Sequence, residues 1–158
     1  MPAKEVQRHV DTRESLYSFE DEVLVVCPKC AACARQIRMD EIDPTTQLHA
    51  RQMVCPKCGL AKKGGLLTLP GVRYYKVREL TLWLQTPCCG ETLWAFNLRH
   101  IETIEAYVRA DLREQHKHPT HGWTNGSFVN RLPKWIKAGD NREEILKGIA
   151  RLKELLPS

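Results

Sequence analysis

The sequence predicts an α+β fold, in which strands come first and helices follow. Short apolar, β-branched runs bounded by turn residues recur up to Phe96 and are typical of strands. After Phe96, apolar residues recur at the spacing of an α-helix. Hydrophobic residues make up 42% of the 158 residues and charged residues 27%, a balance that is typical of a folded globular protein.

The first part of the chain predicts one strand and one hairpin. The apolar run Val23–Val26 predicts a strand that leads directly into a cysteine pair. Residues 34–39 and 47–54 predict two further strands, and the Asp43-Pro44 turn between them predicts that they pair as a hairpin. Glycines and a proline then divide residues 59–73 into loop and short extended pieces.

A second hairpin is predicted between residues 81 and 96. Its arms are TLWLQ and ETLWAF, and the tetrapeptide PCCG forms its turn. One arm carries Trp83 and the other carries Trp94. Because a hairpin of this length is not stable alone, we expect it to pack on another part of the protein.

The first two of three predicted helices follow this hairpin. Asn97 is expected to cap the first helix, which ends near residue 117 in the sequence HKHPTHG. Its apolar stripe is Leu98, Ile101, Ile104, Val108 and Leu112. The second helix is predicted around residues 127–138, where Pro133 either begins a first turn or kinks the helix. Gly139 ends it.

The third predicted helix lies at the end of the sequence. Asp140 is expected at its N-cap, and Glu143 completes a pattern that resembles a capping box. Its broad apolar stripe consists of Ile145, Leu146, Ile149, Leu152, Leu155 and Leu156.

Two copies of the tetrapeptide CPKC carry the strongest chemical signal. Seven cysteines cannot all pair in disulfides, and clustered cysteines in a reducing compartment are more often metal ligands. Zinc takes four tetrahedral ligands, and two cysteines separated by two residues supply a pair of them from one tight turn. The spacing therefore predicts a zinc ribbon that holds one Zn²⁺ with the ligands Cys27, Cys30, Cys55 and Cys58. A rubredoxin-like iron site would use the same four thiolates.

The remaining cysteines and three histidines allow more than one interpretation. Cys33 is expected to be a small apolar residue beside the metal site, although it could compete as a ligand. Cys88 and Cys89 either fill the hairpin turn or act as a further ligand, a redox-active pair or the remnant of a second site. The histidines of HKHPTH are expected in a solvated loop; they are His116, His118 and His121.

The sequence favours a non-enzymatic protein. Arg51 lies where the zinc-deaminase pattern has a glutamate after its histidine, and Val54 replaces the proline that precedes a ligand cysteine. The patterns HExxH, GxSxG and GxxxxGK[ST] are absent. A zinc ion with four thiolate ligands has no open position at which to activate water.

A basic segment extends from Arg51 to Arg78 and contains lysines and arginines but no acidic residue. Positive charge is therefore concentrated in this segment of a chain whose net charge is +5. Lys62 and Lys63 precede two glycines, and two tyrosines lie among the other cations, a composition that suits phosphate contacts and base stacking. The predicted nucleic-acid contacts are Arg51, Lys62, Lys63, Arg73, Tyr74, Tyr75, Lys76 and Arg78. The alternative is a solvated basic face.

Four sequence stretches within residues 21–156 resemble a known family. They are CPKC, CPKCG, LWLQTPCCGETLWAFN and RLPKWIKAGDNREEILKGI, and they are similar to those of small bacterial proteins with a transcription-factor-IIB-type zinc ribbon. Some members are labelled as similar to the primosomal replication-restart helicase. The resemblance implies zinc and a bacterial, cytosolic origin. A helicase motor is not expected, because the chain has no phosphate-binding lysine loop.

These patterns predict three parts: a loosely ordered extension (1–20), the zinc ribbon with the second hairpin (21–97), and a helical part packed on it (98–158). The expected function is that of a nucleic-acid-binding accessory factor. The alternative is a protein-interaction adaptor, or a regulatory or immunity-type partner, that presents Trp123, Trp135 and the last helix. With neither a membrane-spanning run nor a signal peptide in the sequence, we expect a cytoplasmic protein without a membrane partner.

Overall fold

The predicted α+β class is confirmed by a computed structural model of the protein, in which strands form the first part and helices dominate the last. The structure describes residues 8–10, 16–44, 47, 49–63, 66–68, 79–110, 112–114 and 132–157. None of the described helices has the length and hydropathy that a membrane-spanning helix requires.

A four-stranded antiparallel sheet forms the ribbon. Its strands, in spatial order, are β2 (Glu22–Val26), β3 (Cys33–Ile42), β4 (His49–Val54) and β5 (Ala61–Lys63). The predicted strand and hairpin are therefore confirmed, and β5 is one of the short extended pieces expected after residue 59. Val23, Gln36 and Met53 lie at paired positions on one face, and all three side chains are buried.

The second hairpin consists of β8 (Leu84–Cys88) and β9 (Glu91–Ala95), so its first arm begins later than predicted. Residues 81–83 belong to a connection with the ribbon. The strand β7 (Glu79–Thr81) pairs in parallel with β6 (Leu66–Thr68), and Leu82 forms an isolated bridge with Val25 of β2. The sequence TLWLQ alternates like one strand, but these long-range pairings divide it between two sheets.

The described part of the chain contains three α-helices: α1 (Leu98–Arg109), α2 (Lys134–Lys137) and α3 (Arg142–Glu154). The other short elements are the 3-10 helices η1 (Leu16–Phe19) and η2 (Gly139–Asn141) and the parallel strands β1 (Arg8–Val10) and β10 (Leu112–Glu114). Asn97 caps α1 as predicted, because its side chain accepts a hydrogen bond from the backbone N–H of His100 at 2.9 Å.

The prediction that the first helix continues to about residue 117 is wrong. The helix ends at Arg109, and the backbone of Ala110 is extended (φ −69°, ψ 131°). Leu112, predicted in the apolar stripe, lies in β10 and pairs with β1. Leu98, also predicted in the stripe, is 43% exposed, whereas Ile101, Ile104 and Val108 are buried.

The predicted cap of the third helix is also wrong. Asp140 lies within η2, and Asn141 occupies the N-cap position of α3 without a capping hydrogen bond from its side chain. The Asn141 amide instead donates to the carbonyl oxygen of Trp135 at 2.9 Å, which holds α2 against the start of α3. Pro133 directly precedes α2, which agrees with the first-turn alternative, while residues 127–131 lie outside the described residues.

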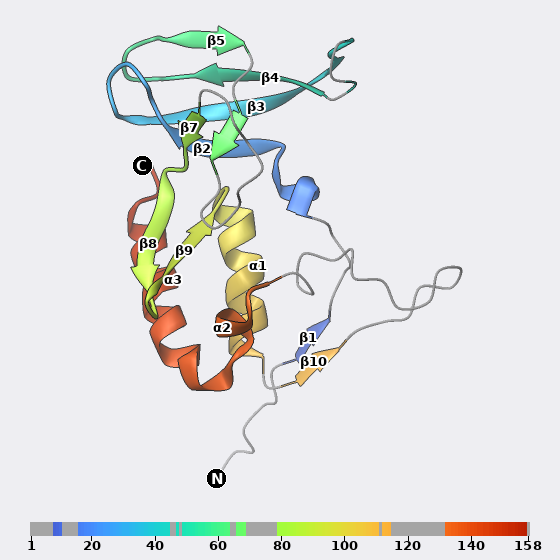
Figure 1. Ribbon diagram of the computed structural model, residues 1–158, viewed down its shortest axis with the longest axis vertical. Helices are drawn as coiled ribbons and strands as arrows, with labels where there is room; N and C mark the ends of the chain where they lie inside the picture. Colours follow the sequence, from blue (N-terminus) through green and yellow to red (C-terminus); the bar gives the residue numbers. More distant parts are fainter. Residues whose placement is uncertain are drawn as a thin grey trace, which may run out of the picture.

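The core continues from the ribbon into the helical part. Figure 1 shows the four-stranded sheet at one end of the molecule, with the hairpin β8–β9, α1 and α3 extending away from it. The largest fully buried side chains come from both parts: Phe19, Met53, Leu82, Leu84, Leu93, Phe96, Ile101, Ile145 and Leu152. Phe19 belongs to the extension that was expected to be loosely ordered, so the described end of that extension is part of the core.

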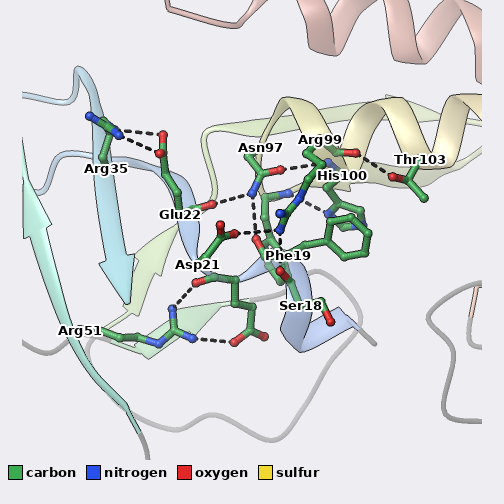
Figure 2. A network of polar contacts seen from close by, with 12 residues as sticks. Ser18, Phe19, Asp21, Glu22, Arg35, Arg51, Asn97, Arg99, His100 and Thr103 are labelled. Atoms are coloured by element: carbon green, nitrogen blue, oxygen red, sulfur yellow. Dashed lines mark hydrogen bonds and ion pairs between the residues drawn. The ribbon is translucent and has the colours of Figure 1, made fainter. Parts of the chain in front are cut away.

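Polar contacts join the ribbon to the start of α1 (Figure 2). The side-chain amide of Asn97 donates to the carbonyl oxygens of Phe19 at 2.8 Å and Glu22 at 2.7 Å. Arg99 forms an ion pair with Asp21 at 3.0 Å. His100 is buried, and burial lowers its pKa to about 3, so it is a neutral member of the core that accepts a hydrogen bond from the Phe96 N–H at 3.0 Å.

Candidate metal centre

The two CPKC sequences form turns with the same hydrogen bonds. In the first, the Cys27 N–H donates to the Ala32 oxygen at 2.8 Å, and the Ala31 N–H donates to the Cys27 oxygen at 2.9 Å. In the second, the corresponding bonds, from Cys55 to Leu60 and from Gly59 to Cys55, measure 2.8 and 2.9 Å. The repeated tetrapeptide therefore folds twice into one local structure.

The strand pairing brings these two turns together. The first turn connects β2 to β3 and the second connects β4 to β5, and because β3 pairs with β4, both turns lie at the same end of the sheet. The turns are thus held by the strands on either side of them, and the cysteines converge without any further element.

The four predicted ligands, Cys27, Cys30, Cys55 and Cys58, form a cluster that could hold a metal ion. Their sulfur atoms all lie within 4.8 Å of one another, with Cys27 Sγ 3.7 Å from Cys58 Sγ and Cys30 Sγ 3.5 Å from Cys55 Sγ. Thiolates bound tetrahedrally at about 2.3 Å from zinc lie about 3.8 Å apart, so the cluster has the size that this geometry requires.

Backbone amides favour the thiolate form of two ligands. The pKa of Cys27 is lowered to about 6, chiefly by the backbone N–H of Cys30 and then by that of Lys29, which lies 3.4 Å from the sulfur. The pKa of Cys55 is lowered by the corresponding amides, Cys58 first. A bound cation would stabilise all four thiolates further through its own charge.

The other cysteines lie outside this cluster. Cys33 begins β3 and is partly buried against the core, so it packs beside the group of four cysteines without belonging to it. Cys88 and Cys89 lie in the turn of the second hairpin, where Cys88 contacts α3 rather than the ribbon turns. The interpretation of either residue as a fifth ligand is therefore not supported.

The structure divides the residues that were predicted to contact nucleic acid. Lys62 and Lys63 are exposed on the edge strand β5. Arg51 is only 16% exposed and forms an ion pair with Glu20 at 2.7 Å, which joins β4 to the residue after η1; its contact with nucleic acid stays a prediction. Five other predicted contacts lie outside the described residues; they are Arg73, Tyr74, Tyr75, Lys76 and Arg78. Trp123 and the three histidines of HKHPTH also lie outside them.

The structure also shows two exposed lysines that the sequence analysis did not assign to a contact surface. Each CPKC turn presents its proline and lysine to solvent, so Lys29 and Lys57 lie at the end of the sheet that carries the cysteine cluster. The repetition of lysine at the same position of both turns is the sequence signal that could have identified them.

Comparisons with family models, with curated proteins and with solved structures found no match for this chain. The metal centre is therefore argued from its own geometry.

Proposed function

We propose that this protein is a non-enzymatic accessory factor that binds nucleic acid through a zinc ribbon. The proposed zinc ion is held by Cys27, Cys30, Cys55 and Cys58 and has a structural role, since four thiolates leave it no open coordination position. The described ribbon is too small to bury a large core of its own, so a structural ion would stabilise the turns and strands that carry the basic residues.

The observation that supports nucleic-acid binding is a group of four exposed lysines on the two CPKC turns and on β5, the strand that follows the second turn. We call this group the basic rim; it consists of Lys29, Lys57, Lys62 and Lys63. Among the described residues, none of the four forms an ion pair, whereas Arg35 and Arg51 of the same sheet are paired with Glu22 and Glu20. Cations that have no protein partner are available to phosphate groups.

The test is the salt dependence of binding to fluorescent single-stranded and duplex oligonucleotides. If all four rim lysines contact phosphates, the slope of log K against log salt is expected to be about −3, because each contact releases a condensed counterion. Replacing Lys62 and Lys63 together by glutamate should abolish binding. Zinc content should not change, since neither lysine belongs to the cluster.

The matched control carries the same change of charge on the helical part. Lys134 and Lys147 are exposed on α2 and α3, and their joint replacement by glutamate should leave most of the binding intact. Equal losses in the two double variants would show that only net charge matters and would contradict a contact at the basic rim.

The competing proposal is a protein-interaction adaptor. It predicts no nucleic-acid affinity near physiological ionic strength and a protein partner that remains bound after nuclease treatment. The described tryptophans give it less support than the rim lysines give to nucleic-acid binding, because Trp83, Trp94 and Trp135 pack against the core. An exposed aromatic anchor would have favoured an adaptor.

A further inference from the structure

The turn of the second hairpin holds two thiols that the metal cluster does not use. Cys88 ends β8, and Cys89 and Gly90 form a two-residue turn with φ angles of 54° and 76°. Positive φ at both positions is the geometry of a type I′ turn, which matches the twist of the two strands. In this turn, Cys88 Sγ lies 3.7 Å from Cys89 Sγ.

The two thiols differ in their surroundings. Cys89 is exposed, whereas Cys88 is 5% exposed and its Sγ lies 3.6 Å from the Glu144 carbonyl oxygen of α3. Burial raises the pKa of Cys88 to about 11, so this thiol is neutral. A reagent from solvent would therefore react first with the exposed Cys89 sulfur, and the buried Cys88 sulfur lies in contact with that sulfur.

The geometry disfavours a direct disulfide between the two residues. Consecutive Cα atoms are about 3.8 Å apart, whereas disulfides usually join Cα atoms at least about 4.4 Å apart. A disulfide would also require the sulfurs to approach to about 2.05 Å. Two sulfurs bound tetrahedrally to one atom at about 2.3 Å lie about 3.8 Å apart, so a single bridging atom would leave the two sulfurs, now 3.7 Å apart, nearly where they are.

We propose that Cys88 and Cys89 form a chelating site for a trivalent, thiophilic metalloid centre, of the kind found in an arsenical. A zinc ion would need four ligands. Among the described residues, Cys88 and Cys89 do not belong to any cluster of three or more possible metal ligands, whereas the four CPKC cysteines form one. A trivalent arsenical that carries one organic group needs two sulfurs to complete its bonds. The pair therefore matches the valence of this ligand class and not that of zinc.

The reaction is a condensation in which no atom is oxidised or reduced. The Cys89 sulfur forms a bond to the arsenic of R–As=O, and its proton moves to the oxygen to give R–As(OH)–S. The Cys88 sulfur then forms the second As–S bond, its proton leaves with the hydroxyl group as water, and R–As(S)₂ remains. Closing this ring removes the Cys88 thiol proton, and with it the hydrogen bond that Cys88 Sγ donates to the Glu144 carbonyl oxygen at 3.6 Å in the free protein.

Phenylarsine oxide and intact-mass spectrometry of the metal-loaded protein test this proposal. We expect one phenylarsenic adduct per chain, formed without release of metal, that survives an excess of a monothiol and is removed by the dithiol 2,3-dimercaptopropanol. The Cys89→Ser variant should lose this adduct, and it should fold because residue 89 is exposed. Cys33→Ser serves as the control and should keep the adduct, because Cys33 lies outside the hairpin turn.

Three results would overturn the proposal. The first is the absence of any monothiol-resistant adduct on the unmodified chain. The second is an equal adduct on Cys89→Ser, which would place the arsenical on other cysteines. The third is release of one metal ion for each adduct formed, which would place it on the CPKC cluster. None of these results bears on nucleic-acid binding, which rests on the basic rim.

Discussion

At the scale of single residues, the two CPKC turns differ at the position after the second cysteine. Both turns need a left-handed backbone there, and the φ angles are 62° at Ala31 and 75° at Gly59. Glycine adopts this conformation without strain, whereas alanine loses about 1–2 kcal/mol because its Cβ approaches the following carbonyl oxygen. The first turn therefore holds strain that the second turn avoids.

Exchanging these two residue types should move stability in opposite directions. Ala31→Gly is expected to stabilise the metal-bound protein by about 0.5–1 kcal/mol, because relief of strain exceeds the extra entropy of an unfolded glycine. Gly59→Ala is expected to destabilise it by a similar amount, and a Cβ at Gly59 would meet no atom within 4 Å, so only the backbone conformation can cause the loss. Denaturant midpoints at a fixed free-metal concentration measure both, and changes of the same sign would contradict this account.

Residue identities could be predicted where chemistry depends on local spacing. The cluster of four cysteines follows from two short repeats, and each turn forms from residues adjacent in sequence. The ion pair of Arg51 could not be predicted in this way, because its partner Glu20 is 31 positions away and lies in the turn before β2. Burial raises the pKa of Glu20 despite the neighbouring Arg51 cation, which indicates a pair enclosed by the fold rather than a surface contact.

At the scale of elements, α3 packs closely on the second hairpin through Gly148. A Cβ at this position would lie 3.0 Å from Leu93 Cδ2 and 3.2 Å from Cys88 Sγ, and both of those side chains are buried. Arg151, one turn later, donates from Nε to Thr86 Oγ1 at 3.1 Å and from Nη2 to the Pro87 oxygen at 2.8 Å. The glycine permits the approach, and the arginine holds the helix along β8.

Gly148→Ala should destabilise the protein although alanine is the better helix former. Helix propensity favours alanine by about 1 kcal/mol, but overpacking a well-filled core costs about 1–3 kcal/mol. We therefore expect a net loss of about 1 kcal/mol, measured as a lower denaturant midpoint. Ala150→Gly, at an exposed position of the same helix, calibrates the propensity and should cost about 1 kcal/mol. A Gly148→Ala protein more stable than its parent would contradict the close packing.

Elements were predictable to the extent that their own sequence specifies them. The ribbon hairpin, the second hairpin and the Asn97 cap follow from turn residues and periodicity within one segment. The end of α1 does not, because the strand that follows it pairs with β1, about a hundred residues earlier in the chain. The start of β8 was misplaced for the same reason, since Leu82 pairs with β2 rather than continuing the hairpin.

At the scale of the whole molecule, main-chain contacts tie the ribbon to the helical part. The Leu24 N–H in the ribbon donates to the Phe96 oxygen at 2.8 Å, and the Trp83 N–H donates to the Leu24 oxygen at 3.0 Å. Farther out, the Trp83 indole donates to the Leu155 oxygen, just beyond α3, at 2.6 Å. These bonds form a continuous path from β2, the strand directly before Cys27, to the end of the last helix.

Loss of the metal should therefore disturb the helices as well as the ribbon. We expect Cys55→Ser to lose most of its metal and to raise amide hydrogen exchange both in β2–β4 and in α1 and α3, because the ribbon supplies part of the common core and the partners of Asn97. Cys89→Ser is the matched control, since it also replaces a cysteine by serine but lies outside the cluster, and it should keep both the metal and the native exchange pattern.

If Cys55→Ser lost its metal while α1 and α3 kept their protection, the ribbon and the helical part would be separate folding units, and the shared core would contribute little to cooperativity. Retention of full metal content by Cys55→Ser would instead remove the four-cysteine assignment itself.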